Sequence, residues 1–335
     1  MKARVTNINN MKVLSLFDGI AGARQALKDL NIDCQYYASE IDKFAIEIAK
    51  SNHPDIRHIG DVKNLFKYHH FHDDKYKSFY NMRRGDIDLL IGGSPCQDLS
   101  IAKKDRQGLQ GERSGLFYEY VRILNEVKPK YFILENVASM SKTSRDIISQ
   151  ELGVEPVLIN SALLTAQQRK RLYWTNIPNV GQPEDKGIVL KDVIESGFVD
   201  REKSHAIISS IGRTTHREYF KKNQGQVVFD KPVRVGEVGK GGQGNRVYSI
   251  NSKSICLNAN SGGLGSKTGL YEFKDGIRKL TVTECERLQG FPDGYCDMVS
   301  KTQGYKALGN SFTVPVIKHI LKNILTNPNN EDSDE

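Results

Sequence analysis

Short apolar runs alternate with longer segments of helical periodicity from residue 12 to about residue 177. Such alternation is typical of strands joined by helices, an arrangement that places the strands side by side and covers both faces of the sheet. The sequence therefore predicts an α/β fold with a doubly wound, mostly parallel sheet. The predicted strands are VLSLF (13–17), QYYASE (35–40), IRHIG (56–60), DLLIGG (88–93), YFILENV (131–137), PVLINS (156–161) and LYWTNI (172–177).

After Pro178 the sequence changes to short, glycine-rich and basic segments without helical periodicity, and these continue to about Phe273. Ten Lys or Arg residues stand against four acidic residues between positions 201 and 246. We interpret this part as a smaller domain of short strands and loops. Its glycines suit close approach to a backbone, either of a ligand or of the protein itself. Solvated loops between short strands would explain the same composition.

These changes in composition and periodicity along the chain define the domains that we expect. The predicted domains are residues 1–178, residues 179–305 with a hinge, a C-terminal helix over 306–326 that returns to the first domain, and a disordered acidic tail over 327–335. The helical pattern PVIKHILKNIL (315–325) supports the third assignment.

Charge and cysteine content narrow the class of protein. The 48 Lys and Arg against 40 Asp and Glu give a formal net charge of +8, which favours a polyanionic partner without requiring one. The five cysteines include no C-x-x-C pair, which argues against a disulfide framework and a thiolate zinc site. HHFHDD (69–74) has no spacing suited to a metal-ligand face, so we expect no metal.

Hydropathy gives no sign of a membrane segment. No apolar run approaches the roughly 18 residues that span a bilayer, and the first ten residues, MKARVTNINN, lack an apolar stretch. We therefore expect a cytoplasmic protein.

The first predicted strand ends in Phe17-Asp-Gly-Ile-Ala-Gly22, and a predicted helix follows. Glycines at this point let a ligand approach the backbone at a helix N-terminus. Glu40 ends the second predicted strand and Asp61 the third, and an apolar residue follows each, Ile41 and Val62. A carboxylate after the second strand can bind ribose hydroxyls. Because the loop has no Lys or Arg to hold a pyrophosphate, S-adenosylmethionine is the cofactor that we expect.

Chemically useful side chains also lie at the ends of other predicted strands. Cys96 comes directly after Ser94-Pro95, where an inert core cysteine would instead lie inside the strand. A thiol becomes nucleophilic as thiolate, which exposed N–H groups or nearby cations favour. Glu135 ends the fifth strand, and QQRKR (167–171) precedes the last. A lone Glu is often a helix cap and a basic pair is usually solvated, but the combination indicates a catalytic site.

In this order, the motifs closely resemble those of the DNA (cytosine-5) methyltransferases over nearly the whole chain. LFDGIAG resembles the cofactor loop of this family, and SPCQDLS resembles its catalytic Pro-Cys motif. Four further segments resemble the later motifs of the family, namely ENV, QQRKR, RKLTVTECERLQGFP and KALGNSFTVPVI. The amino-acid sequence of the catalytic half is most similar to that of the eukaryotic de novo enzymes and their bacterial and phage relatives. One departure is Ala21, where many members have glycine, and it leaves the exact cofactor contacts open.

The resemblance implies a Rossmann-like methyltransferase that converts cytosine to 5-methylcytosine. Cys96 would attack C6 of a cytosine flipped out of the duplex, which makes C5 nucleophilic. Glu135 would bond N3 and the exocyclic amine, and Arg171 would hold O2. Arg169 would steady the surroundings of Cys96 and Glu135. The base that removes the C5 proton is not identified by the resemblance.

The resemblance also implies which residues bind S-adenosylmethionine and its product S-adenosylhomocysteine. The expected cofactor residues are Phe17, Asp18, Gly19, Ile20, Gly22, Glu40, Ile41, Asp61, Val62, Gly93, Pro95, Leu116, Asn310 and Ser311.

Residues 179–305 would form the target-recognition domain, and the segment Asp98 to Glu112 would be the loop that closes over DNA. In relatives, a side chain six residues after the cysteine enters the gap left by the flipped base. Ala102 stands at that position and is too small to fill it, so Ile101, Lys103 or the recognition domain would supply the wedge. The expected DNA contacts are Ser100, Ile101, Ala102, Lys103, Arg213, Thr214, Thr215, Arg217 and Arg246.

The motifs leave two alternatives to the DNA methyltransferase. Methylation of tRNA cytosine by the RNA-directed branch of the family would go with a shorter recognition region and a Cys-Phe-Thr signature, and the chain has neither. A catalytically silent DNA-binding relative would be expected to lose Cys96, Glu135 or the cofactor carboxylates.

The resemblance further implies a bacterial or phage-encoded enzyme that binds double-stranded DNA as a monomer. A separate cognate restriction endonuclease would accompany it if it belongs to a restriction-modification pair.

Overall fold

The computed structural model describes residues 10–66, 85–94, 116–193, 195, 232–239, 243–259, 265, 267–273, 276–278 and 280–326. The chain divides into two compact units. The first comprises Met1–Ile159, Lys170–Gln182 and Val314–Glu335, and the second Asn160–Arg169 and Pro183–Thr313. The functional roles expected for the two domains stay predictions.

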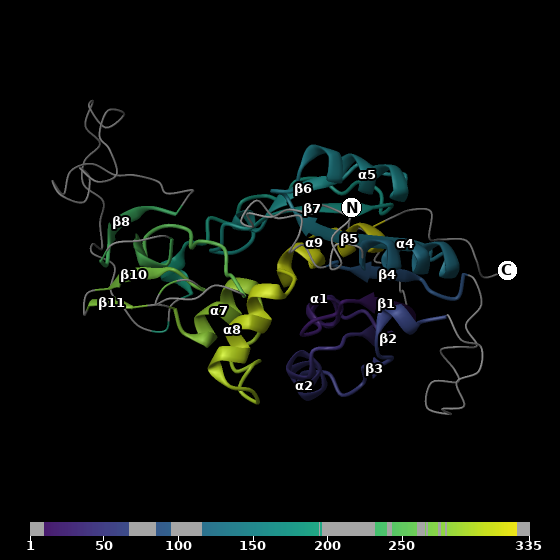
Figure 1. The fold of residues 1–335 in the computed structure, drawn as a ribbon, viewed down its shortest axis with the longest axis horizontal. Coiled ribbons are helices and arrows are strands. Elements are labelled where there is room, and N and C mark those ends of the chain that lie inside the picture. Colours follow the sequence, from purple (N-terminus) through teal and green to yellow (C-terminus); the bar gives the residue numbers. More distant parts are fainter. Residues whose placement is uncertain are drawn as a thin grey trace, which may run out of the picture. The chain divides into compact units, whose positions relative to one another are not determined.

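The described part of the first unit is built on a seven-stranded sheet with the order β3-β2-β1-β4-β5-β7-β6 (Figure 1). The strands are β1 (Met11–Leu16), β2 (Cys34–Ser39), β3 (Arg57–His58), β4 (Leu89–Gly92), β5 (Tyr131–Val137), β6 (Val157–Asn160) and β7 (Lys170–Thr175). The pairs β1–β2, β1–β4, β2–β3 and β4–β5 are parallel, whereas β7 runs antiparallel to β5. The predicted doubly wound, mostly parallel sheet is therefore confirmed.

Helices cover both faces of this sheet. They are α1 (Gly22–Asp29), α2 (Lys43–Asn52), α4 (Leu116–Val127), α5 (Lys142–Leu152) and α9 (Val314–Leu325). On one face, Tyr120 of α4 and Ile148 of α5 pack in one apolar cluster with Leu14 of β1. Helix α1 contacts α9, and their buried side chains lie outside that cluster. Both faces of β1 are consequently buried, as a parallel sheet requires.

Gly92 at the end of β4 shows why a glycine stands at this sheet edge. A Cβ atom at this position would lie 3.0 Å from the carbonyl oxygen of Leu16 and 3.1 Å from the ring of Tyr120. A side chain would therefore push β4 away from β1 or α4. The glycine keeps the carboxyl ends of β1 and β4 close together, which is where the motifs of interest begin.

The described part of the second unit contains a four-stranded sheet with the order β11-β10-β9-β8. Its elements are β8 (Arg234–Glu237), β9 (Arg246–Ser249), β10 (Leu270–Phe273), β11 (Gly276–Arg278), α7 (Val282–Gln289) and α8 (Lys301–Asn310). Helix α7 starts with a capping box, in which Thr281 Oγ1 accepts the Glu284 N–H and the Glu284 carboxylate accepts the Thr281 N–H. This pairing satisfies two N–H groups that the helix cannot satisfy itself.

The single C-terminal helix predicted over 306–326 is corrected by the structure, since the segment contains the end of α8 and all of α9. Ser311 after α8 is extended, with φ −74° and ψ 160°. Pro315 fits the first turn of α9, where its missing N–H is not needed, but its ring would clash with a preceding helical turn. The three residues between the helices therefore form a separate linking segment.

Candidate functional site

The loop between β1 and α1 has an unusual backbone. Phe17, Gly19 and Ala21 have positive φ angles of 56°, 61° and 62°. For a residue with a Cβ, the left-handed conformation costs roughly 1–2 kcal/mol, which explains why glycine is favoured at the position of Ala21. Ala21 is also completely buried, so only a small side chain fits. Ile20 and Gly22 are buried beside it.

Glu40, at the end of β2, organises this loop. Its Oε2 accepts the N–H of Gly19 at 2.8 Å, and its Oε1 accepts the N–H groups of Ile41 at 2.7 Å and Asp42 at 2.8 Å. The next side chain, Ile41, is 73% exposed, which is unusual for a large apolar residue. A fixed carboxylate beside an exposed apolar side chain suits a nucleoside, because hydroxyls donate to the former and a base packs on the latter.

Asp18 lies in the same loop but is only 3% exposed. Its Oδ1 accepts the hydroxyl hydrogen of Tyr36 at 2.6 Å, while its buried Oδ2 has no hydrogen-bond partner among the described residues. Burial raises the pKa of the Asp18 carboxyl to about 7, and the Tyr36 hydroxyl offsets part of this effect. The carboxyl is therefore held largely protonated below neutral pH.

Replacing Asp18 with asparagine is expected to stabilise the protein at pH 8. The folded pKa of Asp18 lies above its ordinary value of 3.8, so its protonation stabilises the folded state at low pH. This stabilisation is lost as the pH rises toward about 7, and a pKa difference of about 3 corresponds to about 4 kcal/mol. Urea unfolding of both proteins between pH 4 and 8 measures it.

The free energy of unfolding of Asp18→Asn should exceed that of the wild type by a few kcal/mol at pH 8, and the gap should close toward pH 4. A gap that is independent of pH would show that Asp18 does not titrate in this range.

The other residues expected at the cofactor occupy the same sheet edge or the adjoining core. Asp61 caps a short 3₁₀ helix (Val62–Asn64), since its Oδ1 accepts the Lys63 N–H at 2.9 Å. Val62 is buried in the core, and Leu116 at the start of α4 packs against that core. Gly93 follows β4 directly. Ligand contacts by these residues stay predictions, and Pro95 lies outside the described residues.

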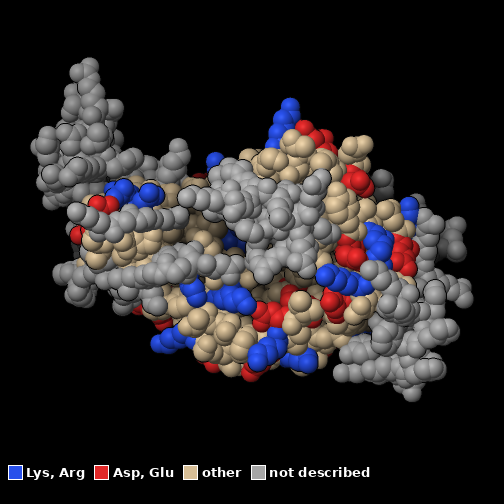
Figure 2. Space-filling view, viewed as in Figure 1, with Lys and Arg blue, Asp and Glu red and all other residues tan. Residues whose placement is uncertain are grey.

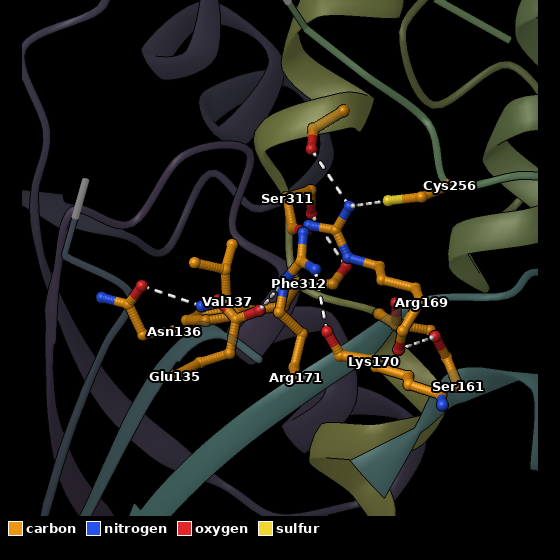
Figure 3. A network of polar contacts seen from close by, with 12 residues as sticks. Glu135, Asn136, Val137, Ser161, Arg169, Lys170, Arg171, Cys256, Ser311 and Phe312 are labelled. Carbon is orange, nitrogen blue, oxygen red and sulfur yellow. Dashed lines mark hydrogen bonds and ion pairs between the residues drawn. The ribbon is translucent and has the colours of Figure 1, made fainter. Parts of the chain in front are cut away.

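Glu135 and Arg171 are brought together by the pairing of β5 with β7. In the antiparallel register Val137 faces Arg171 and Glu135 faces Tyr173, so Glu135 and Arg171 are diagonal neighbours on one face. Arg171 Nε donates to Glu135 Oε1 at 2.8 Å, and the side chains are 16% and 11% exposed (Figure 3). A partly buried, charge-assisted pair of this kind is rigid and well placed to bind a planar polar ligand.

Asn136 is a functional candidate that received no role from the sequence. Its Nδ2 donates to Ser94 Oγ at 3.1 Å and lies 3.4 Å from the Ser94 carbonyl oxygen. Ser94 is the last described residue before Pro95 and Cys96, which lie outside the described residues. Asn136 thus fixes the backbone from which the Cys96 segment departs. The only sequence signal was its place in the ENV motif.

Arg169 and the residues after α8 belong to the second unit. Arg169 is 4% exposed and donates through Nη2 to the Ser311 carbonyl at 2.9 Å and through Nη1 to the Gly309 carbonyl at 3.3 Å (Figure 3). Ser311 itself is buried, whereas Asn310 is exposed at the end of α8. Gln167, in the same motif as Arg169, is completely buried and was not singled out from the sequence.

Most residues expected to contact DNA cannot be placed. Residues 100–103 and 213–217 lie outside the described residues, and so does the rest of the segment from Asp98 to Glu112. Arg246 is exposed at the start of β9. Figure 2 shows Lys and Arg interspersed with Asp and Glu on the visible face, with no continuous basic patch among the described residues there. A basic DNA-binding surface therefore stays a prediction.

The described residues form neither a metal-ligand cluster nor a membrane-spanning helix. Among the described residues, no group of three or more His, Cys, Asp or Glu side chains is placed to hold a metal ion. HHFHDD (69–74) lies outside that part of the chain. Within the described ranges, every helix is too short or too polar to cross a membrane.

Comparison with known proteins identifies related chains. Residues 11–326 match the family described as C-5 cytosine-specific DNA methylase. Type II methyltransferase M.HhaI of Haemophilus parahaemolyticus is 31% identical over 95% of each chain. Type II methyltransferase M.HpaII of Haemophilus parainfluenzae is 30% identical over 93% of this chain and 88% of its own. The structure of methyltransferase EhMeth from Entamoeba histolytica matches the fold with a TM-score of 0.64, at 15% identity over 94% of this chain and 98% of its own.

Proposed function

The chain belongs to the C-5 cytosine-specific DNA methylase family, and we propose that it methylates a cytosine within one short sequence of double-stranded DNA through a covalent bond to Cys96. As a member of this family it is a DNA (cytosine-5)-methyltransferase. The observation that carries the detailed proposal is the Glu135–Arg171 pair of 2.8 Å, because it places an acid and a cation together on neighbouring strands.

We propose S-adenosylmethionine as the cofactor, which supplies an activated methyl group when bound. The loop at Gly19 fits this ligand because its backbone is turned and the Glu40 carboxylate is fixed beside it. Glu40 would accept the ribose hydroxyls, and the exposed side chain of Ile41 would pack against the adenine ring. Absence of Lys and Arg from residues 17–22 matches a ligand without phosphate groups. The other cofactor residues expected from the sequence complete this proposal.

The protein groups act on a cytosine that has left the base stack, since C6 cannot be reached inside a duplex. The Cys96 thiolate adds to C6, and Glu135 supplies a proton to N3, so no full negative charge builds up on the ring. Arg171 holds Glu135 and bonds the carbonyl oxygen O2 of the base. After C5 has been methylated, a base removes the C5 proton, Cys96 leaves as thiolate, and the N3 proton returns to Glu135, which restores the aromatic ring as neutral 5-methylcytosine.

Transfer of labelled methyl groups to two acceptors tests this proposal. The purified chain is incubated with radiolabelled S-adenosylmethionine and either unmethylated duplex DNA or total tRNA. Label should enter the DNA alone, and sequencing should place 5-methylcytosine in one short context. Equal labelling of tRNA would favour the RNA-directed alternative, and label on adenine would contradict the proposal. The same sequencing after expression in a host without cytosine methylation identifies the recognised sequence.

We further propose that the protein acts on DNA as a monomer.

We also propose that it works beside a separate restriction endonuclease, since several relatives are named Type II methyltransferases. Protection of host DNA from digestion by an endonuclease that cuts at the methylated sequence would test this pairing.

A further inference from the structure

The buried guanidinium of Arg169 is bound to backbone carbonyls. Nη1 donates to the Gly309 carbonyl and lies 3.4 Å from Cys256 Sγ, Nη2 donates to the Ser311 carbonyl, and the described residues contain no carboxylate paired with it. Arginine stays charged in proteins, so its burial requires strong acceptors. The acceptors belong to the C-terminal end of α8, whose last carbonyls have no partners within the helix and carry the negative end of its dipole.

A pair of buried glutamines holds the same segment from another side. Gln289 Nε2 donates to the Leu308 carbonyl at 2.7 Å, and its Oε1 accepts the Thr313 hydroxyl at 2.8 Å and Gln167 Nε2 at 3.2 Å. Gln167 Oε1 in turn accepts the Leu257 N–H at 3.0 Å. Both glutamines are completely buried. A buried network with its donors and acceptors paired in this way favours one conformation.

These contacts converge on Leu308–Thr313, which comprises the last three residues of α8 and the linking segment that follows it. Its backbone is also constrained at Gly309, where a Cβ atom would lie 2.6 Å from the Ala259 backbone nitrogen. The segment is thus fixed by Arg169, by Gln289 and by close packing, while the Asn310 side chain stays exposed. This is the arrangement expected when a backbone must present a side chain at one position.

We propose that Arg169, together with Gln167 and Gln289, is a positioning residue that holds Leu308–Thr313 in its ligand-binding conformation and so sets the affinity for the cofactor. The inference rests on the proposed function, which assigns Asn310 and Ser311 to S-adenosylmethionine. It gives Arg169 a different role from the one expected from the resemblance, which was to steady the surroundings of Cys96 and Glu135. Arg169 and Arg171, two residues apart, then serve cofactor binding and base chemistry separately.

The test compares Arg169→Lys with Arg171→Lys in the full-length protein. Lysine keeps the charge but cannot donate to two carbonyls in the geometry of a guanidinium fork. For Arg169→Lys, the Kd of S-adenosylhomocysteine without DNA, measured calorimetrically, should rise about tenfold or more. Its kcat at saturating cofactor and DNA should stay within about twofold. Arg171→Lys should show the opposite pattern, a lower kcat with an unchanged Kd.

Gln289→Met provides a second variant because it removes the glutamine hydrogen bonds at similar volume, and it should raise the same Kd. A double-mutant cycle of Arg169→Lys with Asn310→Ala distinguishes positioning from general loosening. If Arg169 acts through Asn310, the two increases in Kd should be less than multiplicative. Unchanged Kd values in both Arg169→Lys and Gln289→Met, or fully multiplicative effects in the cycle, would overturn the inference.

The proposed function can fail independently of this inference. Calorimetry with S-adenosylhomocysteine reports binding without any methyl transfer. A wild-type protein that binds this ligand but does not methylate cytosine would refute the proposed reaction, while the Arg169→Lys result would still decide the positioning role. Conversely, an Arg169→Lys variant with normal Kd and strongly reduced kcat would return Arg169 to the base chemistry and leave the methyltransferase assignment intact.

Discussion

Replacement of Cys96 with serine is expected to reduce methyl transfer to DNA by a factor on the order of 10⁴ or more. A thiol is a few per cent thiolate at neutral pH and is intrinsically a strong nucleophile, whereas a hydroxyl needs an adjacent base. Without addition at C6, C5 of cytosine is too poorly nucleophilic to accept the methyl group. The initial rate of label transfer from S-adenosylmethionine to duplex DNA measures the loss.

Cys34→Ser is the matched control for this experiment. Cys34 is half-buried at the start of β2, and burial raises the pKa of its thiol to about 11, so it is a poor nucleophile. Its replacement should leave the rate of transfer nearly unchanged. Cys96→Ser should keep DNA and S-adenosylhomocysteine affinities within a fewfold of wild type. Appreciable transfer by Cys96→Ser would refute covalent catalysis by this residue and favour a different nucleophile.

The fold could be predicted from the sequence to the extent that it depends on local patterns. The apolar runs at β1 and β5 locate strands, and the capping box at Thr281 marks the start of α7. The order and direction of neighbouring strands could not be predicted in this way. Strand β7 lies between β5 and β6 and runs antiparallel to β5, because partners are chosen by packing across distant segments. Strand β3 has two residues, fewer than the five predicted over 56–60, and it lies at the edge of the described sheet beside β2.

Only some residues of the candidate site could likewise be predicted from local sequence patterns. Glu135 and Arg171 could be suggested from their places beside predicted strands, and the structure brings them together. Asn136 and Gln289 could not be given roles, because a buried amide is defined by its partners. These partners are Ser94, 42 residues away from Asn136, and Gln167, 122 residues away from Gln289. The sequence shows the polar residue but not the acceptor that makes it tolerable in the core.

Replacement of Glu135 with glutamine is expected to lower kcat by about 10²–10⁴-fold. In the proposed mechanism, a glutamine can still bond the cytosine ring but cannot transfer a proton to N3, so the addition of Cys96 to C6 would lose its acid catalyst. The affinity for S-adenosylhomocysteine should not change, since the proposal places the lost group at the base and not at the cofactor. Single-turnover transfer with saturating enzyme isolates the chemical step from product release.

Part of the loss in Glu135→Gln could arise from breaking its ion pair with Arg171, and a matched substitution separates the two effects. Glu119 of α4 pairs with Arg122 at the same distance of 2.8 Å. Glu119→Gln also exchanges an ion pair for a neutral contact, but it should lower the free energy of unfolding by no more than about 1 kcal/mol and leave kcat unchanged. If Glu135→Gln turns over at a rate near that of Glu119→Gln, proton donation by Glu135 is not part of the mechanism. If it is slow but as stable as the control, the carboxyl acts in the chemical step, because a loss of packing alone would appear in both measurements.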